Sequence, residues 1–599
     1  MGLFARISSE FRFLRGLTRV LMGVREIDPE SGVLICDDFE AAVDRFADHT
    51  AILFENDVVT YRQLDGIANR FAAWAEAQHI QRGETVALLL PNRSEYVAVW
   101  MGLAKRGIAT ALINTNLTGG ALAHCLSISG AQHVITDASL ADAFETIRVQ
   151  LARPIIVWAL DGEGPMGEGR HALDLHSPRL APERPDRSVR TELKSKDVAL
   201  YIFTSGTTGM PKAAKITHVR AQLYMRAFAA ASAATPEDRL YCALPLYHST
   251  GGLCGVGAAL LNGATLVLKR KFSASQFWDD MVRYGCTIFV YIGELCRYLV
   301  NHPPQDDERA HKLRLAFGNG LRPEVWAEFQ DRFNVPEILE FYGSTEGNVS
   351  LFNFDGKPGA VGRVPFYLKT RFPVRLVRFD VESEQPVRGP DGFCIECAPD
   401  EVGEAIGHIG GDARSEYAGY ADKTASERKV LRDALSHGDA WFRTGDLMRQ
   451  DRAGYFYFVD RVGDTFRWKG ENVSTTEVSE TLARAPGVAE AIVYGVKLER
   501  VDGRAGMAAI TPGEEFDIAK LHDDVTKNLP AYARPLFVRL QPEMDTTGTF
   551  KYRKMDLVRD GFDPAKIEHE VYFDDPETNA YVRVTPELYA KIQTGGFRL

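Results

Sequence analysis

Apolar residues recur along the chain with two different periods, and the alternation between these periods predicts a layered α/β structure. The short apolar runs 85–90 and 155–159 fit buried strands, whereas residues 61–78 carry apolar side chains at helical spacing. The alternation extends from about residue 37 to 191 and resumes from 197 to about 460. We therefore expect a parallel or mixed sheet flanked by helices over most of the chain.

A smaller unit with its own strands and helix follows residue 460. Residues 488–496 and 506–510 have the pattern of strands, and 518–528 have that of a helix. The predicted fold class is α/β, with a large, multi-layered N-terminal α/β domain and a smaller α+β C-terminal domain. The predicted segments are an amphipathic N-terminal stretch, the large domain and the small domain, at residues 1–36, 37–462 and 463–599.

Two stretches interrupt the alternation. An uncharged apolar run from 251 to 268 approaches the ~20 residues of a membrane-spanning helix, but Asn262 and Gly263 break it with a turn signal. We favour a helix, a turn and a strand inside a folded core. Residues 161–190 are rich in Pro, Gly, Arg and Asp and lack apolar periodicity, so they are predicted to form an exposed loop.

The first residues form an amphipathic and basic pattern. Apolar and basic side chains both recur at helical spacing, the two sets being Leu3, Ile7, Phe11, Leu14 and Leu21, and Arg6, Arg12, Arg15 and Arg19. The arginines break every apolar run short of a signal-peptide core, so export is not expected. Two interpretations stay open: a helix that lies on an anionic membrane surface, or a helix packed on the protein's own body.

Composition narrows the classes of function. The 599 residues, 45% of them hydrophobic, are too many for one core, and the net charge of -11 opposes broad attachment to nucleic acid. Eight scattered cysteines fit a reducing compartment, and the CxxC of Cys394 and Cys397 lacks the further ligands of a closed zinc site. We therefore expect a cytoplasmic protein, at the inner face of the membrane if the N-terminal helix binds lipid. A homodimer is left open.

The strongest chemical signal is a run rich in glycine and threonine that follows the apolar pattern of residues 198–203. It comprises Thr204, Ser205, Gly206, Thr207, Thr208, Gly209, Met210, Pro211 and Lys212. Glycines let backbone amides turn toward anionic oxygens, hydroxyl groups add donors, and Lys212 supplies a positive charge. The run does not match the Walker pattern, since no lysine directly follows a second glycine at the spacing of that motif. It predicts a phosphate-binding loop, and the alternative is a flexible surface loop.

A second group of candidate residues has the sequence FYGSTEG at 341–347. Glu346 provides a carboxylate of the kind that Mg²⁺ takes together with phosphate oxygens. Tyr342 offers a flat face to a base, and Thr345 can donate to a phosphate. The alternative is a loop whose glutamate caps a helix.

The run TSGTTGMPK is similar to the signature loop of the adenylate-forming superfamily, which includes acyl-CoA synthetases, luciferases and the adenylation domains of peptide synthetases. This resemblance implies that residues 204–212 hold the β- and γ-phosphates of ATP, with Thr204 near Mg²⁺. Segment 341–347 resembles the aromatic-Gly-x-Thr-Glu element of the same superfamily. Further positions implied to contact the nucleotide are Gly318, Asn319 and Gly320 at adenine, Tyr342, Gly343 and Thr345 along the base and α-phosphate, and Asp446 and Arg461 at the ribose.

The resemblance also implies a catalytic lysine and an acyl pocket. The TGTFK segment ends in Lys551, which is expected to stabilise the charge that builds on the α-phosphate during adenylation. The superfamily more commonly places this lysine directly after the glycine, so Lys554 is a second candidate. The segment LPLYH, followed by Gly251, resembles the acyl-pocket segment, which implies that Tyr247 and His248 border the substrate carboxylate. The alternative for His248 is an ordinary core histidine.

The small domain of this superfamily is thought to rotate between the two half-reactions. Gly463 stands at the hinge position that commonly carries Asp or Lys, and glycine has the dihedral freedom of a pivot. The residues implied to serve the hinge and the coenzyme A step are Gly463, Asp464, Arg467, Lys469 and Gly470.

Two longer segments, YIGELCRYL at 291–299 and DTFRWKGENVSTTEV at 464–478, resemble the branch of fatty-acid transport proteins and very-long-chain acyl-CoA synthetases. We therefore expect a long-chain or very-long-chain fatty acid–CoA ligase that uses ATP, Mg²⁺ and coenzyme A and forms an acyl-adenylate, with coupling to fatty-acid uptake left open. Two alternatives remain: a CoA ligase for a bile, aryl or carnitine-type acid, and a lipid-transport protein with vestigial ligase activity.

Overall fold

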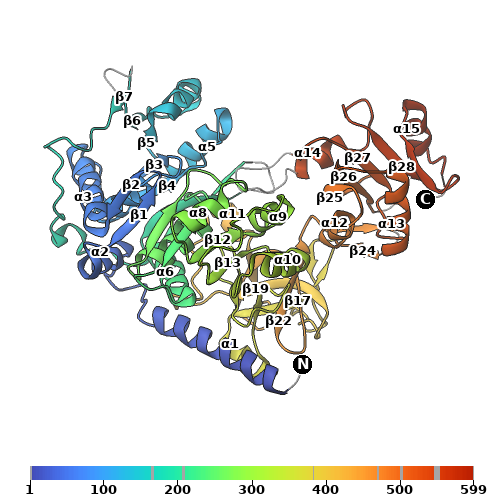
Figure 1. The fold of residues 1–599 in the computed structure, drawn as a ribbon, viewed down its shortest axis with the longest axis horizontal. Helices are drawn as coiled ribbons and strands as arrows, with labels where there is room; N and C mark the ends of the chain where they lie inside the picture. Colours follow the sequence, from blue (N-terminus) through green and yellow to red (C-terminus); the bar gives the residue numbers. More distant parts are fainter. Residues whose placement is uncertain are drawn as a thin grey trace. The chain divides into compact units, whose positions relative to one another are not determined.

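The computed structural model describes residues 3–162, 168–204, 210–381, 383–468, 471–499, 503–544 and 554–597. The chain folds into two compact units, which Figure 1 colours along the sequence. Unit 1 comprises Met1–Pro373, Gly407–Arg432 and Ala440–Phe442, and unit 2 comprises Val374–Ile406, Asp433–Asp439 and Arg443–Leu599.

Unit 1 contains two sheets with helices on their faces (Figure 1). In spatial order, the first sheet consists of β15 (Ser350–Asn353), β14 (Ile338–Gly343), β13 (Leu315–Asn319), β12 (Ile288–Ile292), β10 (Arg239–Cys242), β11 (Thr265–Leu268), β1 (Thr50–Phe54) and β2 (Asp57–Thr60). The second consists of β7 (Arg170–Ala172), β6 (Ile156–Leu160), β5 (His133–Asp137), β3 (Thr85–Leu89), β4 (Ala109–Leu112), β8 (Val198–Thr204) and β9 (Lys212–Thr217). Antiparallel pairs lie at sheet edges, at β14–β15, β1–β2 and β8–β9.

Most helices of unit 1 connect these strands, as parallel pairing requires, whereas the first two precede the strands and the last follows them. They include α1 (Leu3–Val24), α2 (Ile35–Phe46), α3 (Tyr61–Ala77), α4 (Glu95–Ala104), α5 (Gly119–Ser129), α6 (His218–Ser232), α7 (Val256–Leu260), α8 (Phe277–Arg283), α9 (Gly293–Asn301), α10 (Pro323–Phe333) and α11 (Lys423–Glu427). Helix α4 is apolar all round after its first residue and is buried throughout the rest of its length.

The α/β organisation expected from the sequence is confirmed. Runs 85–90 and 155–159 form β3 and β6, and residues 61–78 form α3. Helix α3 begins at a capping box, in which the Gln63 amide donates to Thr60 Oγ1 at 3.2 Å and the Thr60 amide donates to Gln63 Oε1 at 2.8 Å.

The apolar stretch 251–268 is a buried helix, turn and strand, as expected. It contains the π-helix η3 (Thr250–Gly255), α7 and β11, with the turn at Asn262 and Gly263. Among the described residues, no helix combines the length and apolar character needed to cross a bilayer.

The prediction of an exposed loop at 161–190 is wrong in part. The segment contributes strand β7 to the sheet edge, and Arg190 is buried with its Nη2 2.7 Å from Glu40 Oε2. Lys105 is also fully buried, with its Nζ 3.1 Å from Glu40 Oε1. Because an unpaired buried carboxylate is strongly unfavourable, Glu40 needs these cations. The arginine-rich composition of this segment predicted solvent exposure. In the structure, Arg190 is instead buried, and its positive charge is paired with Glu40.

Helix α1 uses one face to pack on the protein's own body and leaves another exposed. Phe13 packs edge-on against Phe354 at 6.4 Å between ring centroids, and a Cβ added at Gly16 would lie 2.4 Å from the same ring. The apolar stripe predicted from the sequence faces outward instead. Its exposed residues are Ile7, Phe11, Leu14 and Leu21, and Met22 is exposed beside them.

Among the described residues, three sheets contain strands of unit 2. The first has the neighbours β22 (Tyr455–Arg461), β21 (Ala440–Gln450), β19 (Val402–His408), β17 (Val374–Asp380) and β18 (Gln385–Pro386). The second has the order β25 (Val488–Val496), β26 (Ala505–Pro512), β27 (Phe537–Leu540), β28 (Val571–Asp575) and β29 (Ala580–Arg583). Further elements are β23 (Phe466–Trp468), β24 (Glu471–Val473), α12 (Thr475–Ala483), α13 (Ile518–Asn528), α14 (Lys554–Asp560) and α15 (Pro586–Gln593).

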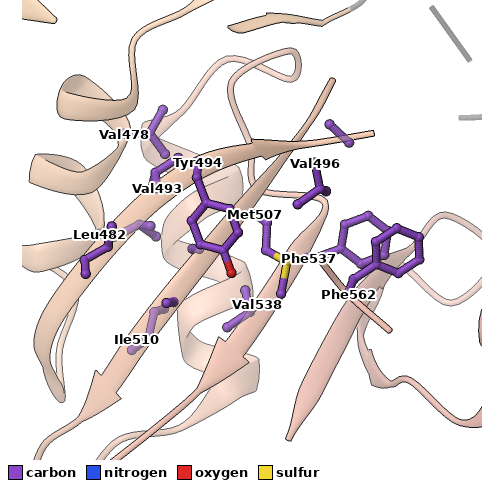
Figure 2. Close-up of a cluster of buried hydrophobic side chains, with 14 of the residues drawn as sticks. Val478, Leu482, Val493, Tyr494, Val496, Met507, Ile510, Phe537, Val538 and Phe562 are labelled. Atoms are coloured by element: carbon purple, nitrogen blue, oxygen red, sulfur yellow. The ribbon is translucent and has the colours of Figure 1, made fainter. Parts of the chain in front are cut away.

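The second sheet of unit 2 encloses a hydrophobic core that Figure 2 shows in close-up. Val493 of β25 and Met507 of β26 are fully buried, and Leu482 reaches this core from α12. Phe537 and Phe562 stack with 4.1 Å between ring centroids. The predicted strands 488–496 and 506–510 and the predicted helix 518–528 are therefore real elements of a separately packed unit.

Candidate active site

The predicted phosphate loop connects the two strands of a hairpin. Strands β8 and β9 pair antiparallel, with Thr204 opposite Lys212 at the base of the connection. Residues Ser205, Gly206, Thr207, Thr208 and Gly209 lie outside the described residues. The pairing register of β8 and β9 therefore places Thr204, at the start of the motif, beside Lys212 at its end.

Tyr420 joins the three described residues predicted to handle phosphate and metal. Its hydroxyl donates to Glu346 Oε1 at 2.7 Å, and its ring lies 5.7 Å from Lys212 Nζ. The Thr204 side chain also hydrogen-bonds Tyr420. Burial and the nearby Glu346 carboxylate raise the pKa of the tyrosine well above its usual value, so it stays protonated and able to donate.

Sequence reasoning missed Tyr420. It reaches the site because residues 419–421 lie along the edge strand β9, where the Ala421 amide donates to the Ala213 carbonyl at 2.8 Å and the Lys215 amide donates to the Gly419 carbonyl at 2.9 Å. Tyr420 is 74 positions from Glu346 in the chain, and no spacing rule connects them.

The loop that carries Glu346 is held from helix α6. The Tyr224 hydroxyl and Arg220 Nη2 both donate to the Ser344 carbonyl, at 2.8 and 3.0 Å. A Cβ at Gly347 would lie 2.2 Å from both the Phe442 ring and Ser344 Oγ, so the loop requires glycine there. These contacts fix the direction in which the Glu346 carboxylate leaves the backbone.

Thr345 connects this loop to the predicted acyl segment. Its Oγ1 lies 3.0 Å from Ser249 Oγ, directly after His248, so the α-phosphate and carboxylate candidates are neighbours. His248 is half-buried and its ring lies 4.5 Å from that of Tyr247. Burial raises the pKa of Tyr247 to about 12, so its hydroxyl is neutral at physiological pH.

Asn92 holds the acyl segment in place, a role that no motif in the sequence predicts. Its Nδ2 donates to the carbonyls of Leu244 and Lys269, both at 2.9 Å, and its Oδ1 accepts from the Leu246 amide at 3.0 Å. Both donor and acceptor ends of the buried amide are therefore satisfied by backbone groups.

The two glycines after His248 lie in the first turn of a π-helix, at positions that have no room for a side chain. A Cβ at Gly251 would lie 2.9 Å from the Pro245 carbonyl oxygen, and one at Gly252 only 2.1 Å from the Leu246 carbonyl oxygen. Short π-helical turns often occur at functional sites. Gly251 thus allows this turn to fold back on the segment that presents Tyr247 and His248.

The predicted adenine turn lies at the carboxyl end of β13. Gly318 and Asn319 are the last residues of that strand, and Gly320 follows with φ at +80°. The buried Oδ1 of Asn319 accepts no hydrogen bond from the described residues, which leaves an acceptor for a ligand. Tyr342 and Gly343 end the neighbouring strand β14, at the same edge of the sheet. Ligands commonly bind at this edge of α/β sheets.

The two predicted ribose residues are paired within unit 2. Asp446 of β21 stands opposite Arg461 of β22, and Arg461 Nε lies 3.4 Å from Asp446 Oδ1. Thr444 Oγ1 accepts from the Asp446 amide at 3.0 Å and donates to the Ala405 carbonyl at 2.7 Å. This ion pair orients the Asp446 carboxylate.

The hinge candidates follow directly in unit 2. Gly463 has φ at +90°, a conformation that residues with a side chain rarely adopt. Lys554 Nζ lies 3.3 Å from Asp464 Oδ2 and 3.0 Å from Thr475 Oγ1, so the second lysine candidate is already engaged. Arg467 lies on β23, whereas Lys469, Gly470 and Lys551 lie outside the described residues.

No cluster of three or more His, Cys, Asp or Glu side chains with a metal-binding arrangement occurs in the part of the chain that the structure describes. Glu346 and Thr204 are the described side chains predicted to face a cation, and phosphate and water oxygens would complete its shell. This donor set suits Mg²⁺, which usually keeps several waters and binds through one or two carboxylates together with phosphates. The arrangement can hold a metal-bound triphosphate beside a carboxylate.

Comparison with known proteins identifies the family of this chain. Residues 39–392 match the model of the family described as AMP-binding enzyme, and residues 477–551 match the AMP-binding enzyme C-terminal domain. Long-chain fatty acid transport protein 6 of Mus musculus is 42% identical over 93% of this chain and 91% of its own length. Long-chain fatty acid transport protein 1 of Homo sapiens is 41% identical over 97% of this chain and 91% of its own length.

Solved structures share the fold at lower identity. The ATP-bound MatB of Rhodopseudomonas palustris has a TM-score of 0.73 at 22% identity, covering 88% of this chain and 98% of that one. The anthranilate CoA ligase AuaEII in complex with anthranoyl-AMP has a TM-score of 0.74 at 22% identity, covering 89% and 98%. The chain belongs to the AMP-binding enzyme family, and within this adenylate-forming superfamily to the long-chain fatty acid transport protein branch.

Proposed function

We propose that this chain is an ATP-dependent acyl-CoA synthetase that converts long-chain fatty acids to their coenzyme A thioesters through an acyl-adenylate. The observation that carries the proposal is the convergence of Thr204, Lys212 and Glu346 on Tyr420. The adjacent Thr345 contacts Ser249 of the acyl segment. Groups suited to phosphate, metal and carboxylate therefore lie within a few hydrogen bonds of one another.

The first half-reaction joins the fatty acid to AMP. A carboxylate oxygen attacks the α-phosphorus, an oxygen–phosphorus bond forms, and the bond to the bridging oxygen breaks to release pyrophosphate. Lys212 and the 204–212 loop hold the β- and γ-phosphates, and Thr345 donates to the α-phosphate. Bound through Glu346 and Thr204, Mg²⁺ would neutralise phosphate charge. Lys551 stabilises the negative charge that grows on the α-phosphate.

The second half-reaction transfers the acyl group to sulfur. The coenzyme A thiolate attacks the acyl carbonyl carbon and AMP leaves, which is far easier than expelling an oxide from a free carboxylate. We assign this step to Gly463, Asp464, Arg467, Lys469 and Gly470, with Gly463 as the pivot between a large domain at 37–462 and a small domain at 463–599. The φ of +90° at Gly463 supports that role.

Base and sugar would be held by separate groups. The Asn319 Oδ1 acceptor suits the amino group of adenine, and Tyr342 offers the aromatic face. Asp446 can accept hydrogen bonds from both ribose hydroxyls, with Arg461 beside it.

A panel of acids tests the substrate class. Fatty acids of graded length, a bile acid, an aryl acid and carnitine are each supplied with ATP, Mg²⁺ and coenzyme A, and AMP release is measured. The proposal expects kcat/KM to be highest for chains of long or very long length. Higher kcat/KM for the bile, aryl or carnitine-type acid would overturn the long-chain assignment, and no AMP release with any acid would indicate vestigial catalysis.

We also infer that α1 docks on an anionic membrane surface. Phe11 is 66% exposed, and Phe366 of η4 (Phe366–Arg371) is 85% exposed. Glu10 pairs with Arg363 at 2.7 Å and hydrogen-bonds Tyr367, so these two exposed rings belong to one surface. Exposed cations lie on the same two helices as the rings, in a protein with a net charge of -11; they are Arg12, Arg15, Lys369 and Arg371.

Replacing Phe11 and Phe366 together by Asp tests this surface. Binding to vesicles of phosphatidylcholine with phosphatidylserine should fall by at least about 10-fold, because two apolar rings are lost from the bilayer. The matched control is Val149→Asp, which alters a valine that is 93% exposed on η1 (Ala138–Gln150). Equal sedimentation of both variants with the vesicles would contradict the inference.

The homodimer and the placement at the inner membrane face stay predictions. All eight cysteines are free, which supports a reducing compartment.

A further inference from the structure

We propose that Glu340 and Tyr291 are positioning residues that hold the adenine-binding turn, Gly318 to Leu321, in its working conformation. The inference rests on the nucleotide site proposed above. Neither side chain is among the nucleotide-binding residues that the resemblance implied.

Three parallel strands bring the two residues together across a glycine. Tyr291 of β12 pairs with Gly318 of β13, and Gly318 pairs with Glu340 of β14, so the three residues form one row on one face of the sheet. A Cβ at Gly318 would lie 2.5 Å from the Tyr291 ring. Since glycine stands there, the tyrosine passes over the middle strand and its hydroxyl donates to Glu340 Oε2 at 2.6 Å.

The other carboxyl oxygen holds the turn itself. Glu340 Oε1 accepts from the Leu321 amide at 3.0 Å, and the Gly320 amide also hydrogen-bonds the Glu340 carboxyl group. On the opposite side the turn is pressed against the start of α9, where a Cβ at Gly293 would lie 1.9 Å from the Gly320 carbonyl oxygen. The carboxyl group and this close backbone contact together restrict the turn on two sides.

Burying an acid in a core is less favourable than burying an apolar side chain of the same size, which indicates that Glu340 has a specific role. It is only 2% exposed, and burial raises its pKa to about 8 despite the hydrogen bonds from Tyr291, Leu321 and Gly320 that lower it. The other ionisable group that faces it is Cys296 of α9. An apolar pair would fill the same space without this cost, but it would leave the two turn amides without acceptors.

The same strand carries the aromatic candidate for the base. Glu340 and Tyr342 are two residues apart on β14, so they lie on the same face of the strand. Glu340 thereby fixes the turn relative to the strand that presents Tyr342. A preset gap between turn and ring lowers the ordering cost of binding a flat base.

The test separates positioning from fold stability through the Michaelis constants. Glu340→Leu removes both acceptors, so KM for ATP should rise about 10-fold or more while KM for the fatty acid changes less than about 2-fold. Glu340→Gln keeps an acceptor oxygen for the amides and a donor for Tyr291, and should restore KM for ATP to within about 2-fold of wild type. Tyr291→Phe should give an intermediate rise, of about 3-fold.

Tyr241→Phe is the matched control, because Tyr241 lies on β10 of the same sheet and its hydroxyl donates to the buried Asp280 of α8 at 3.4 Å, not to the turn. It should leave KM for ATP unchanged. The inference is overturned if Glu340→Leu and Glu340→Gln raise KM for ATP equally, which would indicate direct contact with the base. It is also overturned if the variants lower only the melting temperature. Should Glu340→Leu not fold, the Gln and Phe variants, each altered by one or two atoms, still decide the outcome. If the wild-type protein makes no acyl-adenylate, it is the proposed function that fails.

Discussion

Replacing Lys551 by alanine is expected to abolish acyl-adenylate formation, with a loss of at least about 100- to 1,000-fold in fatty-acid-dependent pyrophosphate release. As the carboxylate attacks, negative charge accumulates on the oxygens of the α-phosphate. A positioned ammonium group stabilises this charge more than it stabilises bound ATP, so its removal lowers kcat more than it raises KM.

Lys554→Ala provides the matched control for this prediction. Lys554 is the second lysine candidate, but its Nζ already bonds Thr475 Oγ1 at 3.0 Å and Asp464 Oδ2 at 3.3 Å within unit 2. Its loss should therefore cost adenylation less than about 10-fold. An inactive Lys554→Ala enzyme beside an active Lys551→Ala enzyme would transfer the catalytic role to Lys554.

Glu346→Gln is expected to reduce adenylation by about 100-fold and to raise the Mg²⁺ concentration needed for half-maximal rate. The amide retains the shape of the side chain and its bond to Tyr420, but it loses the charge that a hard cation requires. Titration of pyrophosphate release with Mg²⁺ at saturating ATP measures the effect.

Tyr420→Phe is the control for Glu346, since it keeps the Glu346 carboxylate and removes the hydrogen bonds of the Tyr420 hydroxyl, which are the bond of 2.7 Å to Glu346 Oε1 and the bond with Thr204. We expect a loss of about 10-fold or less, with a smaller shift in the Mg²⁺ requirement. If Glu346→Gln titrated with Mg²⁺ like the wild-type protein, Glu346 would not be a metal ligand.

The local pattern of apolar residues predicted the strands and helices well, because each element forms according to the residues within its own segment. The alternation at 488–496 and the helical spacing at 518–528 each match the observed β25 and α13 to the residue. Each of these segments buries one face or both against a neighbour, so the spacing of its own apolar residues indicates the element that it forms. The prediction for residues 161–190 was wrong in part because Arg190 pairs with a buried acid, Glu40, that lies far away in the sequence. No local pattern reveals such a partner.

The candidate site was predictable where it resides in a continuous motif. Thr204, Lys212 and Glu346 stand in motifs that the sequence displays, and the structure brings all three to Tyr420. Tyr420 and Asn92 could not be identified, because their roles arise from pairing with segments far away in the chain.

The N-terminal helix shows a further reason why sequence reasoning was incomplete. Periodicity identified one apolar stripe but not the second contact face, which depends on Gly16 and on the partner Phe354. Glycine contributes no hydrophobic signal, so the buried face is hidden in the pattern.

In the proposed reaction the fatty acid carboxylate becomes bonded to the α-phosphorus of ATP, and every assigned residue role depends on this step. Incubating the wild-type protein with a long-chain fatty acid carrying ¹⁸O in its carboxylate, together with ATP, Mg²⁺ and coenzyme A, tests this directly. Mass spectrometry of the products should find one ¹⁸O atom in AMP and none in pyrophosphate. Unlabelled AMP, or label released in orthophosphate alongside ADP, would contradict the claim.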